Sequence, residues 1–157
     1  MKYKGAVIIP ARYKSTRFPG KPLVDIFGKP MIQRVHEKCA SAVGSQNVYV
    51  ATDSDDIEAS VESFSGNVIR TSENCLTGTD RLAEANETLN FDFIVNVQGD
   101  EPLVQPEDVK KVFEIMKADV SNLINCYCDI EKEEITMSSV PKVVISESEK
   151  LVYMSRS

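Results

Sequence analysis

The basic side chains of residues 11–22, ARYKSTRFPGKP, are the first group along the sequence whose types and spacing suggest chemistry. Arg12, Lys14, Arg17 and Lys21 lie among two prolines and a glycine, a composition that predicts a loop. Arginine forks and lysine ammonium groups suit phosphate oxygens, so the loop predicts a small anionic ligand. A solvated basic loop is the alternative interpretation.

This loop matches neither of two common phosphate-binding patterns. It is not a Walker A loop, because position 15 is serine rather than glycine and Pro22 follows Lys21. The chain also contains no G-x-G-x-x-G fingerprint. A generic dinucleotide-binding oxidoreductase is therefore poorly supported.

Acidic and amide side chains end the most apolar segment of the chain, in the sequence QGDEP at residues 98–102. Asp100 stands at the expected end of a strand, where a carboxylate is placed to bind Mg²⁺ and bridge it to substrate phosphates. The alternative is an ordinary acidic turn in which Glu101 and Pro102 cap the next helix.

A third segment, TGTDRLAEA at residues 77–85, places hydroxyls and a glycine just before a predicted helix. Thr77 or Thr79 can serve as the helix N-cap, and Asp80 is a favourable first-turn acid. Arg81 fits less well, because a cation in the first turn is mildly unfavourable without a partner or a ligand.

The elements that must position these segments alternate along the chain. Short apolar runs predict strands and three- and four-residue spacings predict helices. Such alternation predicts an α/β fold with a mostly parallel sheet covered by helices on both faces, whose ligands gather at the carboxyl ends of the strands. The predicted strands are 5–10, 47–53, 67–71 and 91–98, the predicted helices are 30–44, 54–64, 81–89 and 106–118, and residues 141–146 and 150–155 form a C-terminal hairpin.

Length and charge narrow the function classes. A chain of 157 residues predicts one domain. Every charged residue before Asp25 is basic, six in all. Because the net charge of the whole chain is −6, the residues after these six carry a net charge of −12. An acidic bulk with one basic loop argues against nucleic-acid binding.

The apolar runs bear on where the protein is located, and the spacing of the cysteines bears on whether it binds a metal. No apolar run approaches the length of a membrane span, and none fits a signal peptide. The four cysteines form no C-x-x-C pair, and one histidine gives no Cys/His metal spacing. We therefore expect a cytoplasmic protein. We expect His36 to serve packing or solvation, and Cys126 and Cys128 to alternate along a strand and pack in the core.

Taken together, five ordered segments resemble the 3-deoxy-D-manno-octulosonate (KDO) cytidylyltransferase family, also called CMP-KDO synthetases. Single pieces are less specific than their joint appearance over nearly the whole chain. The segments are VIIPARYKSTRFPGKPLVDIFGKPMIQRV (7–35), VATDSDDI (50–57), TGTDRLAE (77–84), FIVNVQGDEPLV (93–104) and KVVISESEKLVYMSRS (142–157).

The resemblance implies a Rossmann-like nucleotidyltransferase fold and transfer of CMP from CTP to the anomeric hydroxyl of KDO, for lipopolysaccharide synthesis. It implies Arg12, Lys21 and Asp100 as the catalytic set, with Mg²⁺ on Asp100. Residue by residue, Ala11, Arg12 and Lys21 would hold the CTP phosphates, Ser15 and Gly20 would shape the loop, Thr71, Ser72 and Arg81 would line the cytidine pocket, Gln98 would reach the ribose or the sugar, and Arg156 would face the sugar carboxylate.

Two features depart from the family pattern. Cys75 and Thr77 stand where the family has histidine and serine. The family also continues beyond Ser157, with a second metal-binding carboxylate, more of the sugar pocket and most of a homodimer interface. We therefore expect residues 1–157 to form a single nucleotidyltransferase domain that binds CTP but transfers CMP slowly or not at all.

Two other readings stay open. One is a cytidylyltransferase for another acidic sugar, of the acylneuraminate or amino-KDO type. The other is a truncated, non-catalytic nucleotide-binding module.

Overall fold

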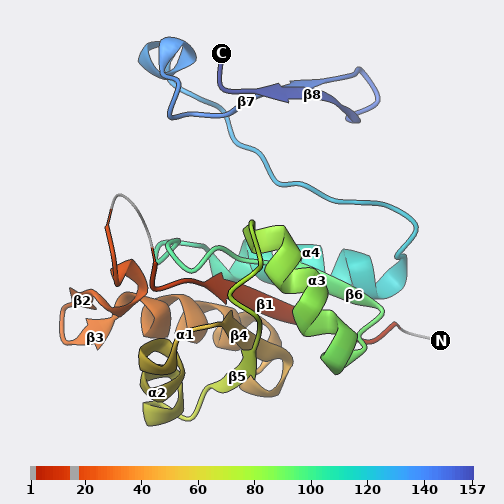
Figure 1. Ribbon diagram of the computed structural model, residues 1–157. Helices are drawn as coiled ribbons and strands as arrows, with labels where there is room; N and C mark the ends of the chain where they lie inside the picture. Colours follow the sequence, from red (N-terminus) through yellow and green to blue (C-terminus); the bar gives the residue numbers. More distant parts are fainter. Residues whose placement is uncertain (1–2, 15–17) are drawn as a thin grey trace. The chain divides into compact units, whose positions relative to one another are not determined.

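The computed structural model describes residues 3–14 and 18–157, and the chain forms two compact units, Met1–Asn122 and Leu123–Ser157 (Figure 1). The first unit holds the sheet and its helices. No helix in the described ranges has the length and apolar character needed to cross a membrane. The prediction of one domain over residues 1–157 concerns both units and stays a prediction.

Four parallel strands form the central sheet of the first unit, in the order β5-β4-β1-β6. The central strand β1 is buried along its whole length, as its unbroken apolar run predicts. The predicted parallel sheet is confirmed, although its last strand ends at Asn96, two residues before Gln98. The strands are β1 (Gly5–Ala11), β4 (Val48–Thr52), β5 (Asn67–Arg70) and β6 (Phe93–Asn96).

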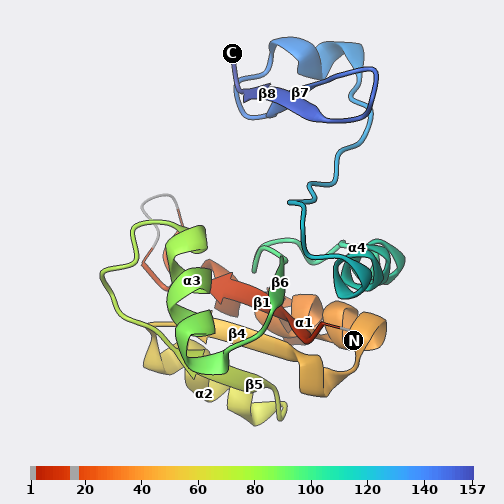
Figure 2. The same cartoon turned by 90° about the vertical axis from the view of Figure 1, so that its right-hand side faces the viewer.

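Helices cover both faces of this sheet, as predicted, and Figure 2 shows α3 and α4 on opposite sides of it. One face packs against α1, α2 and α4 through Ile32, Ile57 and Phe113. The other face packs against α3 through Leu82 and Ala85. The helices are α1 (Met31–Val43), α2 (Asp55–Ser63), α3 (Gly78–Leu89) and α4 (Pro106–Ala118).

Capping residues explain where these helices begin. The Ser54 side chain accepts a hydrogen bond from the Ile57 amide at the start of α2. Helix α3 begins at Gly78, earlier than the predicted range 81–89, and Thr77, one of the two predicted N-caps, forms a reciprocal capping box with Asp80. Asp80 is thus explained by helix capping, and its two hydrogen bonds from Thr77 lower the pKa of its carboxyl group.

A small hairpin that the sequence patterns did not predict follows the basic loop. Phe27 and Gly28 both have positive φ, 51° and 79°, as the tight turn between two short strands requires. Asp25 Oδ1 accepts a hydrogen bond from the Gly28 amide at 3.0 Å and holds the turn. The short elements of the first unit are η1 (Lys21–Leu23), β2 (Asp25–Ile26), β3 (Lys29–Pro30) and η2 (Ser45–Asn47).

The second unit contains a 3-10 helix and the predicted antiparallel hairpin, formed by η3 (Lys132–Thr136), β7 (Lys142–Ile145) and β8 (Leu151–Ser155). The prediction that Cys126 and Cys128 pack in a core along a strand is wrong. Residues 123–130 form no strand, and both thiols are exposed. Alternation predicts a packed strand only where a neighbouring strand or helix covers one face.

Candidate nucleotide site

The order of the parallel strands identifies the edge at which a ligand is expected. Strand β1 lies between β4, which follows it in the chain, and β6, which joins its other side. The chain adds β4 and then β5 on one side of β1 and later adds β6 on its other side, so the strand order switches at β1. In open α/β sheets ligands bind outside the carboxyl ends of the strands at such a point. Ala11 ends β1 here, and Gln98 follows β6.

The turn after β6 packs closely on the end of β1. A Cβ atom added to Gly99 would lie 2.9 Å from the carbonyl oxygen of Pro10, so a side chain at this position would clash with backbone. Glycine therefore allows the QGD turn to approach β1. This close packing brings Asp100 beside the basic loop.

Lys21 and Asp100 form an ion pair, with Nζ 2.6 Å from Oδ2. Gly20, with φ of 71°, precedes Lys21, and its amide donates to the Tyr13 carbonyl at 2.9 Å. This bond closes the loop and turns Lys21 toward the QGD turn. Ser15, the other residue predicted to shape the loop, lies outside the described residues.

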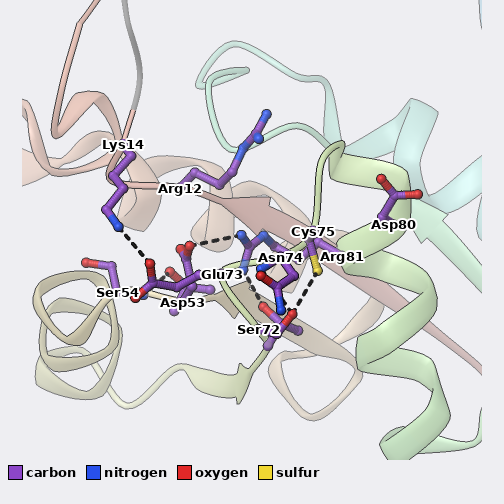
Figure 3. A network of polar contacts seen from close by, with 12 residues as sticks. Arg12, Lys14, Asp53, Ser54, Ser72, Glu73, Asn74, Cys75, Asp80 and Arg81 are labelled. Atoms are coloured by element: carbon purple, nitrogen blue, oxygen red, sulfur yellow. Dashed lines mark hydrogen bonds and ion pairs between the residues drawn. The ribbon is translucent and has the colours of Figure 1, made fainter.

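Arg12 connects the basic loop to the segment between β5 and α3. Its Nη1 donates to the Leu76 carbonyl at 3.0 Å, and Lys14 Nζ lies 2.7 Å from Glu73 Oε2. In Figure 3 the Arg12 side chain points away from the cluster around Arg81. The basic loop and the segment that leads into α3 thus meet at Arg12.

Arg81 is completely buried at the first turn of α3 (Figure 3). Its Nη1 donates to Thr71 Oγ1, and its Nη2 lies 3.3 Å from Asp53 Oδ2. Nε and Nη2 have no hydrogen-bond partner among the described residues. The partner that a first-turn cation needs is therefore Asp53, at the end of β4.

Glu84, one turn further along α3, binds two residues of the segment between β5 and α3. Its carboxylate accepts hydrogen bonds from the Ser72 amide at 2.5 Å, the Ser72 hydroxyl at 3.0 Å and the Cys75 thiol at 3.1 Å. The bonds from Cys75 and Ser72 lower the pKa of Glu84. Burial, followed by the bond to Glu84, raises the pKa of the Cys75 thiol. The thiol is therefore held protonated as a donor.

The remaining predicted residues make contacts of their own. Gln98 Nε2 donates to Asn96 Oδ1 at 3.2 Å, beside the QGD turn. Arg156 belongs to the second unit, where its Nη1 donates to the Ser139 carbonyl at 3.0 Å. His36 is buried against Phe64, in agreement with a packing role.

Three polar residues of the cluster escaped the sequence analysis: Asp53, Glu73 and Glu84. The unexplained first-turn Arg81 was a usable signal, because a buried cation requires a carboxylate nearby. Asp53 also borders a pocket of about 140 Å³ that opens between the ends of β1, β4 and β5. The residues that line it are Tyr13, Lys14, Asp53, Ser54, Asp56 and Glu73.

Comparisons with known proteins agree with this geometry. A family model described as "Cytidylyltransferase" matches residues 6–157. The chain is 49% identical over 152 residues to a 3-deoxy-manno-octulosonate cytidylyltransferase of Cytophaga hutchinsonii, covering 95% of this chain and 60% of the relative. It is 43% identical to an 8-amino-3,8-dideoxy-manno-octulosonate cytidylyltransferase of Shewanella putrefaciens, covering 96% of this chain and 64% of that protein.

A solved structure of a CMP:2-keto-3-deoxy-manno-octonic acid synthetase complexed with CTP is also similar. It superimposes with a TM-score of 0.87 at 39% identity, covering 98% of this chain and 64% of that one. The chain thus spans less than two thirds of the length of each of these three proteins.

Proposed function

Because this chain belongs to the cytidylyltransferase family, we propose that it serves the transfer of CMP from CTP to the anomeric hydroxyl of KDO. In this reaction the hydroxyl oxygen bonds to the α-phosphorus of CTP and its proton passes to water, the bond from that phosphorus to the β-phosphate oxygen breaks, and pyrophosphate leaves with the electron pair. The relatives named for this reaction and the structure complexed with CTP support the proposal.

The observation that carries the proposal is the position of Lys21, Asp100 and Arg12 at the carboxyl ends of β1 and β6. Arg12 and Lys21, with the Ala11 backbone, would bind the CTP phosphates, while Ser15 and Gly20 would shape the loop. Phosphoryl transfer depends on positioning and charge neutralisation more than on covalent help from the protein. The cations at this edge would supply that neutralisation.

Asp100 would hold a divalent cation, which we propose to be Mg²⁺. No group of three or more histidine, cysteine or acidic side chains placed to hold a metal exists within the described residues. A single half-exposed carboxylate fits Mg²⁺ all the same, because this ion uses one or two carboxylates together with substrate phosphates. The bound cation would offset the charge of the leaving pyrophosphate.

The segment between β5 and α3 would form the cytidine pocket. Thr71 and Ser72 would face the base, and the buried Arg81 would support them from behind. Gln98 would reach the ribose or the sugar, and Arg156 would face the sugar carboxylate. The thiol of Cys75, held by Glu84, would take the place of the family's histidine.

The acidic sugar could carry an amino group instead. The 43% identity to an 8-amino-3,8-dideoxy-manno-octulosonate cytidylyltransferase favours this second candidate. The family match over residues 6–157 supports one nucleotidyltransferase domain containing both units. We also propose that the complete protein is a homodimer and works in the cytoplasm, where its four free thiols would stay reduced.

Calorimetric titration of the chain with CTP, UTP and ATP, each with Mg²⁺, tests the nucleotide assignment. We expect CTP to bind most tightly, and equal affinities for the three nucleotides would contradict it. Pyrophosphate release with KDO, its 8-amino analogue and an acylneuraminate then separates the sugar candidates, because the preferred sugar should give the fastest release.

A further inference from the structure

The peptide group between Leu76 and Thr77 lies between two charged side chains. On one side, the Thr77 amide donates a hydrogen bond to Asp80 Oδ2 at 2.8 Å. On the other side, the Leu76 carbonyl accepts a hydrogen bond from Arg12 Nη1 at 3.0 Å. In Figure 3 the chain that leads into α3 passes between the side chains of Arg12 and Asp80. These two residues, far apart in the sequence, are thus joined through one peptide group.

The geometry of this peptide group fixes the direction of its carbonyl. The peptide is trans and therefore planar, with its N–H and C=O bonds pointing in opposite directions. Because Asp80 holds the N–H toward α3, the Leu76 carbonyl is turned away from the helix and toward Arg12. The capping box that starts α3 therefore also places an acceptor for Arg12.

The charges at the two ends of the peptide group reinforce this contact. The hydrogen bonds from Thr77 lower the pKa of the Asp80 carboxyl group, so this residue is charged at neutral pH. A carboxylate at the N–H end and a guanidinium at the C=O end polarise the peptide in the same sense, and hydrogen bonds in such a chain strengthen one another. The Leu76 carbonyl is therefore a better acceptor than a carbonyl without this partner.

A bond at one edge of a guanidinium orients its other edges, because its five N–H donors lie in one rigid plane. The Leu76 carbonyl is the one hydrogen-bond partner of Arg12 within the part of the chain that the structure describes. The other N–H groups of Arg12 stay available to an anion at the end of β1. Holding a flexible side chain in place before a ligand binds reduces the entropy that binding costs.

We propose that Asp80 is a positioning residue for Arg12: through the peptide group 76–77 it holds the guanidinium where the remaining N–H groups can bind a phosphate. This inference rests on the proposed function, in which Arg12 binds the CTP phosphates. It gives Asp80 a second role beside helix capping.

Calorimetric titration with inorganic triphosphate, without Mg²⁺, tests this role, because the probe carries neither a base nor a sugar. We expect Asp80→Ala to bind the probe about threefold to tenfold more weakly than the wild type, the size of coupling between members of one hydrogen-bond network. The loss of a negative charge alone would act in the opposite direction and strengthen the binding of an anion. Asp80→Glu keeps a carboxylate in the capping box and should restore most of the affinity.

The effect should depend on Arg12. In an Arg12→Ala background, Asp80→Ala should no longer weaken triphosphate binding, because the side chain that Asp80 positions is absent. Asp92→Ala is the matched control and should bind triphosphate as the wild type does. Asp92 is also an exposed aspartate that accepts a backbone amide, from Lys4 at 2.7 Å, but it lies directly before β6, at the opposite edge of the sheet.

Urea unfolding of the same variants separates positioning from helix capping. A role in capping only would lower the free energy of unfolding of Asp80→Ala and leave the triphosphate affinity of the folded protein unchanged. If Asp80→Ala does not fold, Asp80→Asn decides. Its amide oxygen can still accept from Thr77, but the charge that polarises the peptide is gone, so we expect weaker triphosphate binding here too.

Failure of this inference and failure of the proposed function give different results. If Arg12→Ala weakens triphosphate binding but Asp80→Ala binds as well as the wild type or better, Asp80 does not position Arg12 and the proposed function stands. An equal effect of Asp80→Ala with and without Arg12 leads to the same conclusion. If the wild type does not bind triphosphate, or Arg12→Ala binds it equally well, the proposed phosphate site fails and this inference fails with it.

Discussion

The ammonium group of Lys21 lies 2.6 Å from the carboxylate of Asp100, which joins the end of the basic loop to the turn after β6. Both side chains are partly exposed, 39% and 49%, so the pair contributes little to folding stability. We propose that its importance is the charge that it would present to a ligand. A triphosphate would compete for Lys21, and Asp100 would then need a cation of its own.

Asp100→Asn should therefore have opposite effects on CTP binding with and without Mg²⁺. Without the ion we expect tighter binding than in the wild type, because a repelling charge is gone and Lys21 is released. The factor by which Mg²⁺ strengthens CTP binding should be about tenfold smaller in the variant than in the wild type, as expected for one close charge at this edge. Calorimetry with and without Mg²⁺ measures both effects.

Glu107→Gln, an exposed position in the first turn of α4, is the control and should respond to Mg²⁺ as the wild type does. The same Mg²⁺ response in Asp100→Asn would remove Asp100 from the cation site.

Arg12→Ala should weaken CTP binding by about tenfold to a hundredfold, the range for losing charge-assisted hydrogen bonds. The physical reason is that Arg12 stands directly after β1, where the phosphates are proposed to lie. Lys38→Ala removes one positive charge from helix α1 and should leave the affinity within about twofold of the wild type. Titration of both variants with CTP checks the difference, and equal affinities would argue against phosphate binding by the basic loop.

Most of the fold could be predicted from local sequence patterns, because in the first unit the apolar residues of each pattern are the residues that pack in the core. The apolar run that became β1 is buried on both faces, and the spacing of Ile32, Val35 and Cys39 became the buried stripe of α1. The alternating residues around Tyr127 gave a false prediction, because no neighbouring strand covers that segment.

The site was harder to predict because its contacts join residues far apart in the chain. The charge on Asp100 and its place after an apolar strand were visible, and so was the missing partner of Arg81. The identity of that partner was not, since Asp53 meets Arg81 only after β4 and α3 pack on each other. Glu84 likewise looked like one more acidic residue on a helix surface until its three donors were known.

The four thiols should differ in reactivity toward a soluble disulfide reagent. Cys126 and Cys128 are exposed and should react first, whereas burial raises the pKa of Cys39 to about 12 and should make it slowest. Glu84→Gln removes the carboxylate that holds the Cys75 proton. The Cys75 thiol pKa should fall, and its rate should rise by up to about tenfold for each unit.

Mass spectrometry of the labelled peptides measures the rate at each cysteine. Glu87→Gln alters an exposed carboxylate on the same helix and should leave the Cys75 rate unchanged. Equal Cys75 rates in both variants would show that burial protects this thiol without help from Glu84.

The one histidine of the chain should make folding stability depend on pH below neutrality. Burial lowers the pKa of His36 from 6.5, and its Nε2 has no hydrogen-bond partner among the described residues. The unfolded chain therefore binds the proton more readily than the folded one. The contribution of the neutral His36 to folding stability should be fully present above pH 6.5 and fall as the pH drops toward the folded pKa, by up to about 1.4 kcal/mol for each pH unit.

Urea unfolding at pH 7.5 and 5.5 measures this fall in stability. His36→Gln should reduce the fall, because the glutamine side chain binds no proton in this range. An equal fall in both proteins would assign the pH dependence to the carboxylates instead.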